Sequence, residues 1–368
     1  MEIDRRTLMH GAAASLLLPW ARLAAKASEQ APLYAAAYRA DGGGFGAALF
    51  HQDGTLKNTV ALPDRGHGFA VDARRQRVVA FARRPGNFAF CLSQDNAQQP
   101  LWFSPPRGRH FYGHGIFSPD GRILYATENQ IETSDGIIGL YDATDGFKPL
   151  GAFQTGGIGP HDLAIMPDSR TLLVANGGIK THPDFGREEL NIETMRPSLT
   201  YLDTQTGEIR ETVQLSKDLH KLSLRHLAVN EAGLAIIGCQ HKGARNEQPD
   251  LVLTHRIGGE PRALALPGDA AQMLNNYVSA VAIDASGRYA AVTSSKGGVV
   301  LVIDLEQRRL VKKNQLADVS GIAPAPALAG AFFVTAGTSA VGEFGLNEPG
   351  VATHQTGMAW DNHVVRVS

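Results

Sequence analysis

One motif recurs along the chain, and its spacing limits the folds that the chain can adopt. Three copies are clearest: 66–72, 113–120 and 160–168. The second residue of each copy is a histidine, and these residues, His67, His114 and His161, are 47 residues apart. A short turn and a β-rich run follow each copy, and a third strand then ends in Asp before a turn, as at Asp142, Asp203 and Asp304. The repeating unit is therefore four short strands.

Weaker copies extend the series to seven. Aligning the small residue of each inner strand places Arg225, Ser279 and Ser320 where the histidines stand. A seventh copy at the C-terminus contributes His363 but has no strands after it. Residues 33–62 read as three strands that lack a first one. We therefore expect the two ends of the chain to share the seventh unit.

Seven units of four short strands, spaced 41 to 64 residues apart, are typical of a β-propeller. A β-sandwich does not repeat at this period, and the coils of a β-helix are shorter. A single blade cannot bury both of its faces, so the ring is expected to fold as one domain, residues 28–368. The sequence predicts an all-β, seven-bladed propeller whose seventh blade is closed by N- and C-terminal strands.

The two cysteines follow from this assignment. Cys91 falls on the third strand of the first complete blade, and Cys239 on the second strand of the fourth. A disulfide needs Cα atoms roughly 6 Å apart, and these blades lie on different sides of the ring. We expect two free, largely buried thiols.

The first 27 residues have the form of a twin-arginine export signal. An Arg5-Arg6 pair precedes an apolar stretch, and small residues stand at Ala25 and Ala27. The apolar stretch is far shorter than the about twenty residues of a membrane span. Cleavage after Ala27, a periplasmic location and no membrane span in the mature chain are expected. The alternative is a basic amphipathic start to a cytosolic protein.

Charge and motifs exclude several function classes. The 35 Lys and Arg residues nearly balance the 36 Asp and Glu residues, which gives no electrostatic reason to expect nucleic acid as a partner. Phosphate-binding loops, Gly-x-Ser-x-Gly, His-Glu-x-x-His and Cys-x-x-Cys-His are all absent. The missing Cys-x-x-Cys-His motif excludes a covalently attached c-type haem. Catalysis at a metal in the channel is not excluded, but the sequence does not assign catalytic residues.

The histidines predict a metal site. The first strand of each blade lines the central channel, so residues at equal register on different blades form a ring. His363, His67, His114 and His161 stand at that register on four consecutive blades. Neutral imidazole is a common ligand of transition metals, which need three or four donors at about 2.0 to 2.2 Å. Glu128 is expected as an additional oxygen ligand or as a supporting carboxylate. The alternatives are histidines that only brace buried turns, and an organic ligand or haem.

Two long loops are expected to cover this channel mouth. They span 177–197 in the third blade and 240–250 in the fourth, and unstructured loops of such length are often functional. The candidate lid and mouth residues are His182, Asp184, Arg187, Arg225, Asn176 and His241. His226 follows Arg225, and strict strand alternation points its ring away from the axis.

Several motifs together resemble the bacterial DUF1513 family. They are Tyr112-Gly113-His114-Gly115, Gly159-Pro160-His161, Thr181-His182-Pro183-Asp184, Met195-Arg196-Pro197-Ser198-Leu199 and Trp360-Asp361-Asn362-His363. The resemblance covers essentially the whole mature chain. It implies a seven-bladed propeller, encoded beside imelysin-like and di-haem oxidoreductase-like proteins in loci associated with periplasmic iron uptake. It carries no activity over to particular residues.

Three functions remain open on this basis. The first is a monomeric periplasmic propeller that holds iron and works with those iron-uptake proteins, although affinity order at an all-imidazole site favours copper. The second is a copper- or iron-dependent oxidoreductase that uses the same ligands. The third is a metal-free platform for protein interactions.

Overall fold

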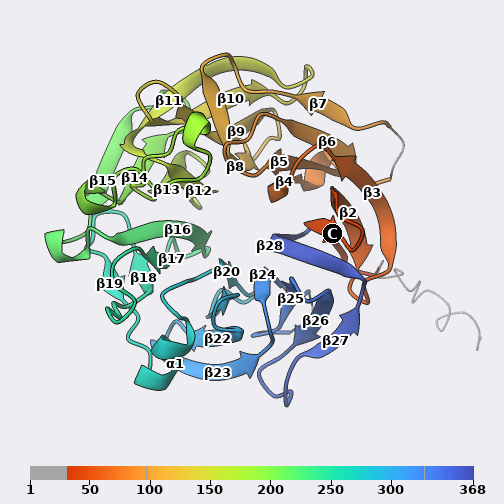
Figure 1. Ribbon diagram of the computed structural model, residues 1–368, viewed down its shortest axis with the longest axis vertical. Helices are drawn as coiled ribbons and strands as arrows, with labels where there is room; N and C mark the ends of the chain where they lie inside the picture. The colour runs from red at the N-terminus through yellow and green to blue at the C-terminus, as the bar shows by residue number, and fades with distance from the viewer. Residues whose placement is uncertain (1–30, 96–97, 327) are drawn as a thin grey trace, which may run out of the picture. The chain divides into compact units, whose positions relative to one another are not determined.

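Seven four-stranded antiparallel sheets stand around a central axis, as the repeat predicts (Figure 1). The computed structural model describes residues 31–95, 98–326 and 328–368, and the count of sheets refers to these residues. The predicted export signal, 1–27, lies outside them. The unit Pro32–Ser368 is described here by itself.

Blades 1 to 6 each take four strands that are consecutive in sequence, the first lying innermost. Blade 1 consists of β4 (Gly66–Asp72), β5 (Arg77–Ala82), β6 (Ala89–Ser93) and β7 (Leu101–Phe103). Blade 2 consists of β8 (Arg109–Phe117), β9 (Ile123–Gln130), β10 (Asp135–Asp142) and β11 (Lys148–Ile158). Blade 3 consists of β12 (Pro160–Ile165), β13 (Thr171–Asn176), β14 (Ser198–Asp203) and β15 (Ile209–Gln214). Blade 4 consists of β16 (Leu222–Val229), β17 (Ala235–His241), β18 (Val252–His255) and β19 (Arg262–Ala263). Blade 5 consists of β20 (Ala280–Ile283), β21 (Tyr289–Ser294), β22 (Val299–Asp304) and β23 (Arg309–Gln315). Blade 6 consists of β24 (Val319–Pro324), β25 (Phe332–Ala336), β26 (Ala340–Phe344) and β27 (Ala352–Gln355). A short helix, α1 (Gly268–Met273), connects blades 4 and 5.

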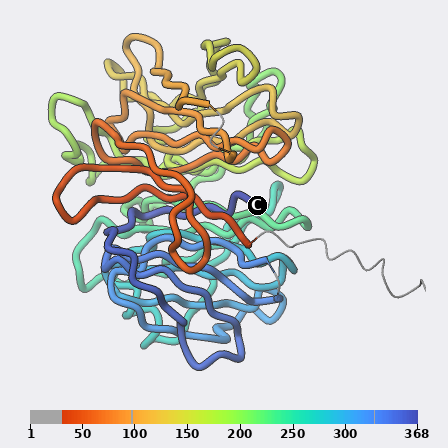
Figure 2. Tube along the Cα trace, turned by 90° about the vertical axis from the view of Figure 1, so that its right-hand side faces the viewer, coloured from red at the N-terminus to blue at the C-terminus, as the bar shows by residue number. Residues whose placement is uncertain are grey.

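Blade 7 joins the two ends of the chain, as predicted. Its inner strand is β28 (Met358–Arg366), which pairs with β1 (Leu33–Ala40); β2 (Phe45–His51) and β3 (Leu56–Leu62) follow outward. Figures 1 and 2 show the red N-terminal strands beside the blue C-terminal strand. The Trp360 ring of β28 stacks on Phe50 of β2 with centroids 4.4 Å apart, so the closure is packed as well as hydrogen-bonded.

The core lies between neighbouring blades. Every residue of β13, β14 and β22 is buried, because each middle strand is covered on both faces by the adjacent blades. The outer strands are only half covered, and β11 and β15 are largely exposed. Apolar side chains that meet between blades thus hold the ring together.

Both cysteines are free thiols on the predicted strands. Cys91 lies half-buried in β6, and Cys239 lies buried in β17. Burial raises the pKa of the Cys91 thiol to about 11 and that of Cys239 further still. The prediction of two unpaired thiols is confirmed.

The inner strands are irregular where they carry the channel residues. In β12, Pro160 pairs with Asn176 and Asp162 with the next residue, Ala175, which leaves His161 without a pairing partner. The same kind of shift falls at Arg225 in β16 and at Ser320 in β24, and longer ones include His67, His114 and His363. A β-bulge of this kind interrupts the alternation of side chains and re-aims them.

Candidate metal centre

Five imidazole rings form a closed circuit at the channel axis. They are His67, His114, His161, His226 and His363, carried by the inner strands of blades 1 to 4 and 7. Around the circuit, successive ring centroids lie between 4.6 and 5.1 Å apart. The structure thus brings together the four histidines that the repeat singled out and adds a fifth.

The expectation that His226 points away from the axis is wrong. Its ring lies 4.8 Å from that of His161 and 4.9 Å from that of His363. The cause is the bulge at Arg225, where Leu224 pairs with Cys239 and His226 with the next residue, Gly238. Because the bulge breaks strict alternation, Arg225 and His226 line the same cavity.

The ring nitrogens fall into two groups of three that suit a metal ion. One group is His67, His114 and His363, and the other is His114, His161 and His226; within each group the ligand atoms lie within 4.8 Å of one another. His114 belongs to both groups, but only its Nε2 lacks a partner. Since one lone pair serves one ion, the cluster suits a single ion rather than two.

Buried nitrogens without hydrogen-bond partners mark the cluster. Among the described residues they include Nδ1 of His67, Nε2 of His114, Nδ1 of His161, both ring nitrogens of His226 and Nε2 of His363. Buried polar atoms in folded proteins are nearly always paired, so several orphaned nitrogens in one place need an explanation. A bound cation would give these lone pairs a partner.

Four imidazoles of the cluster, those of His67, His161, His226 and His363, are neutral at physiological pH. Burial holds the pKa of His67, His161 and His363 well below the usual range, and repulsion between the clustered histidines acts in the same direction; arginines add to this effect at His67 and His161. Burial also lowers the pKa of His226 to about 3. Neutral imidazole is the form that ligates metals.

Two aspartates lie against the cluster from outside. Asp162 lies 3.3 Å from Nδ1 of His114 and accepts the backbone N–H of Leu227. Asp361 lies 3.8 Å from Nδ1 of His67 and pairs with Arg65. Asp162 is therefore placed to fix the orientation of the His114 ring and to increase its basicity as a ligand through Nε2, whereas Asp361 is too far from the His67 ring for a hydrogen bond.

Glu128 lies elsewhere. Its carboxylate accepts the hydroxyl of Tyr141 and lies 3.5 Å from the Arg109 guanidinium, inside blade 2. It belongs to neither group of potential metal ligands found in the described residues. β9 does return toward the channel face, but this side chain is directed into the blade.

Cavities adjoin the cluster on two sides. One, of about 160 Å³, is lined by His67, His161 and His226 together with basic side chains. The other, of about 500 Å³, follows the inner strands and is lined by His114, His226 and His363. His226 borders both cavities, so the cluster separates them.

The predicted mouth residues divide between the cluster and other places. Arg187 and Arg225 line the smaller cavity. His182 borders a different surface hollow, and its Nδ1 accepts the backbone N–H of Asp184. The others are engaged locally: Asn176 donates to Ser198 and Thr200, and His241 pairs with Glu247 at 2.7 Å.

Four cavity residues were not predicted from the sequence: Arg83, Arg84, Tyr277 and Asn362. Glu189, Gln240 and Lys242, which also line the cavity, fall within the two loops that were expected to cover the channel mouth. Arg83 and Arg84 follow the second strand of blade 1, which ends at the histidine face. That position is a usable signal, because second strands return to the face where first strands begin.

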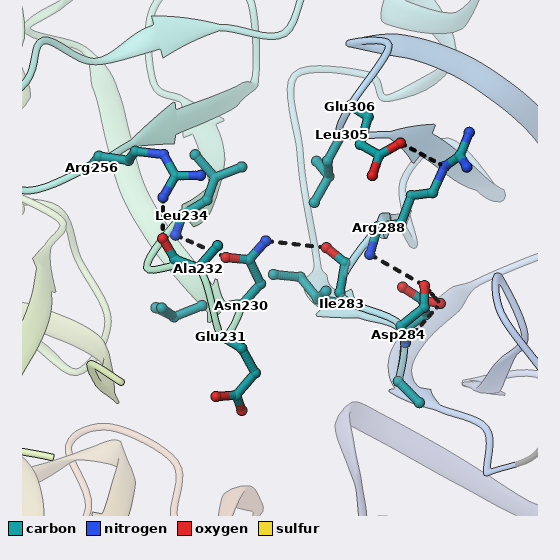
Figure 3. Close-up of a pocket in the computed structure, with 14 residues that line it drawn as sticks. Asn230, Glu231, Ala232, Leu234, Arg256, Ile283, Asp284, Arg288, Leu305 and Glu306 are labelled. Atoms are coloured by element: carbon teal, nitrogen blue, oxygen red, sulfur yellow. Dashed lines mark hydrogen bonds and ion pairs between the residues drawn. The ribbon is translucent and has the colours of Figure 1, made fainter. Parts of the chain in front are cut away.

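A larger hollow, of about 600 Å³, lies at the opposite face, where turns of blades 4 and 5 meet (Figure 3). Its polar groups already pair with one another. Asn230 accepts the N–H of Leu234 and donates to Gly287, and Arg288 pairs with Glu306. These bonds brace the turns and leave little for a ligand.

Fold and cluster together define a seven-bladed β-propeller with a ring of axial histidines. Comparison with protein families agrees with the resemblance noted in the sequence. The chain belongs to the DUF1513 family, a protein family of unknown function, whose profile matches residues 60–367.

Solved structures show the fold alone. Hydrazine synthase from Kuenenia stuttgartiensis matches with a TM-score of 0.60 and 15% identity, over 84% of this chain and 89% of that one. The β-propeller domain of Cps50 (Swd1) from Myceliophteria thermophila matches with a TM-score of 0.56 and 10% identity, over 79% and 86%. No curated protein matches the sequence. In the described part of the chain, no helix has the length and apolarity to cross a bilayer.

Proposed function

We propose that the protein binds one transition-metal ion through its axial histidine cluster. The observation that carries this proposal is the set of buried ring nitrogens that lack hydrogen-bond partners although they face one another. The low pKa values of the rings, three donors within ligand range and the Asp162 carboxylate beside His114 support it. The proposed setting is the periplasm, beside imelysin-like and di-haem oxidoreductase-like proteins, and it rests on the family resemblance and the export signal.

The identity of the ion rests on the donor set. An oxygen ligand such as Glu128 would favour iron, but that carboxylate lies outside the cluster. An all-imidazole set binds Cu²⁺ more tightly than Fe²⁺. The proposal is therefore copper by affinity, with iron as the ion that the family resemblance implies.

Elemental analysis of the exported, folded protein tests this proposal. We expect close to one metal ion per chain, and the element present decides between copper and iron. His114→Ala removes the ligand common to both groups and should abolish metal retention. His354→Ala, an exposed histidine of β27, should leave the metal content unchanged. Wild-type protein without stoichiometric metal would remove the proposal.

Access to the cluster favours a metal-dependent oxidoreductase as the second candidate. The smaller cavity reaches His67, His161 and His226, so a small molecule can approach an ion held there. Turnover of ferrous iron or of a redox dye by the metal-loaded protein, lost in His161→Ala, would distinguish catalysis from storage. Metal binding without turnover would contradict the oxidoreductase and support metal binding as the function.

A further inference from the structure

The smaller cavity over the histidines carries a large excess of positive charge. Its basic side chains are Arg83, Arg84, Arg187, Arg225 and Lys242. Its one carboxylate, Glu189, is engaged with Lys242 at 2.6 Å. Within the described residues, none of the four arginines has a carboxylate within ion-pair distance. The four guanidinium groups therefore have no ion-pair partner among the described residues, although Asp361 and Glu189 lie close enough to act on some of them electrostatically.

Among these arginines, Arg225 has the highest free-energy cost of burial. It is only 3% exposed, and its Nε has no hydrogen-bond partner among the described residues. Nη1 of Arg83 is likewise buried and unpartnered. Burial lowers the pKa of Arg83 and of Arg225 to about 10; neighbouring guanidinium groups act in the same direction, while Asp361 opposes the shift at Arg83 and Glu189 opposes it at Arg225. A buried, unpaired cation is strongly unfavourable, so an anion in the cavity would relieve it.

The donors around the cavity are held in place. Arg84 lies over the Tyr112 ring at 5.0 Å and donates to the Tyr112 hydroxyl at 3.0 Å. Arg225 stands on the bulge of β16, and Arg187 approaches from the long loop of blade 3. Planar guanidinium groups match carboxylate and phosphate oxygens in geometry. The volume of about 160 Å³ admits only a small ligand.

We propose that this cavity binds a small, multiply charged oxyanion through Arg83, Arg84, Arg187 and Arg225, directly over the histidine cluster. The inference goes beyond metal binding and does not require an ion in the cluster. Inorganic phosphate and a tricarboxylate such as citrate share this chemistry. With a metal present, oxygens of the same anion would lie next to the ion.

Calorimetric titration of the metal-free, full mature chain tests the proposal. Chelator is dialysed away first, and phosphate and citrate are titrated separately at pH 7 and low ionic strength. We expect saturable one-to-one binding of at least one anion, weakened at least tenfold by Arg225→Gln and by Arg187→Gln. Arg74→Gln, an exposed arginine in the 3₁₀ turn Ala73–Arg75, should leave the affinity unchanged.

The outcomes separate this proposal from metal binding. If neither anion binds, or if Arg187→Gln binds as tightly as wild type, the proposal is overturned. Arg187 is exposed, so that variant is informative even if Arg225→Gln fails to fold. If only phosphate or only citrate binds, that result supports the proposal and identifies which of the two classes of anion the cavity recognises. Anion binding by a protein that retains no metal would remove the proposed function and leave this inference intact.

Discussion

Glu128 is a buried carboxylate whose protonation is linked to folding. It lies in β9 with no exposed surface, between the Tyr141 hydroxyl and the Arg109 guanidinium. Burial raises its pKa to about 7, although those two contacts act in the opposite direction. The folded state therefore holds the proton more tightly than the unfolded state does. Its contribution to stability is fully present below about pH 4.5 and is lost as the pH rises through about 7.

Replacing this group should change how stability depends on pH. We expect the free energy of unfolding of Glu128→Gln, relative to wild type, to rise by about 3 kcal/mol between pH 4.5 and pH 8. Urea unfolding at several pH values measures this difference. A difference that stays constant with pH would show that Glu128 is ionised in the folded protein throughout.

The sequence predicted four of the five histidines of the cluster, because those four follow the repeat and the fifth does not. His67, His114, His161 and His363 stand at one register of the repeat, so their convergence follows from ring geometry. His226 stands one residue off that register, and only the bulge at Arg225 brings it inward. Bulges leave no reliable trace in a single sequence.

At the scale of elements, the inner strands hold the histidines by close backbone contact. Gly113 in β8 has φ +111°, and a Cβ atom built there would lie 2.5 Å from Cδ2 of the His67 ring on the neighbouring blade. The strand can therefore lie against that ring only while residue 113 lacks a side chain. Backbone of one blade thereby positions a ligand of the next.

Gly113→Ala should therefore damage both stability and the cluster. We expect a loss of about 1 to 3 kcal/mol from backbone strain, together with displacement of His67 and weaker metal retention. Gly108→Ala is the matched control, because Gly108 has φ +85° but open space around its Cβ position. It should show the strain alone. Equal metal content in the two variants would argue against the contact with His67.

The strand order was predictable for the same reason as the four histidines. The blades repeat β-rich runs and turns, with Asp at the end of the third strand in blades 2, 3 and 5, and local pattern and global fold agree. The loops were less predictable. Arg83 and Arg84 enter the cavity from a connection within blade 1, and nothing in the repeat fixes where such side chains point.

At the scale of the whole molecule, the ring depends on its closure in blade 7. β28 pairs with β1, and Trp360 packs on Phe50, while Tyr34 stacks on Phe333 of blade 6 at 3.9 Å. These contacts join segments from the two ends of the chain to each other and to the neighbouring blade. Loss of them would open the ring at one place.

Trp360→Ala should reveal how much this closure contributes. The side chain is buried, so we expect a loss of about 3 to 5 kcal/mol, seen as a lower midpoint of thermal or urea unfolding. Trp102→Ala on the outer strand β7 is the control, because that residue is 43% exposed and should lose less than half as much. Similar losses of stability in both variants would mean that the closure of blade 7 contributes no more to the free energy of unfolding than an outer strand does.

His363 lies on β28, the strand that closes blade 7 by pairing with β1. The circuit of imidazoles therefore cannot be complete until β28 has joined β1. A ring in which these two strands have not met lacks one of the five imidazoles at the axis. Metal occupancy of the axis would thus report on whether blade 7 has closed.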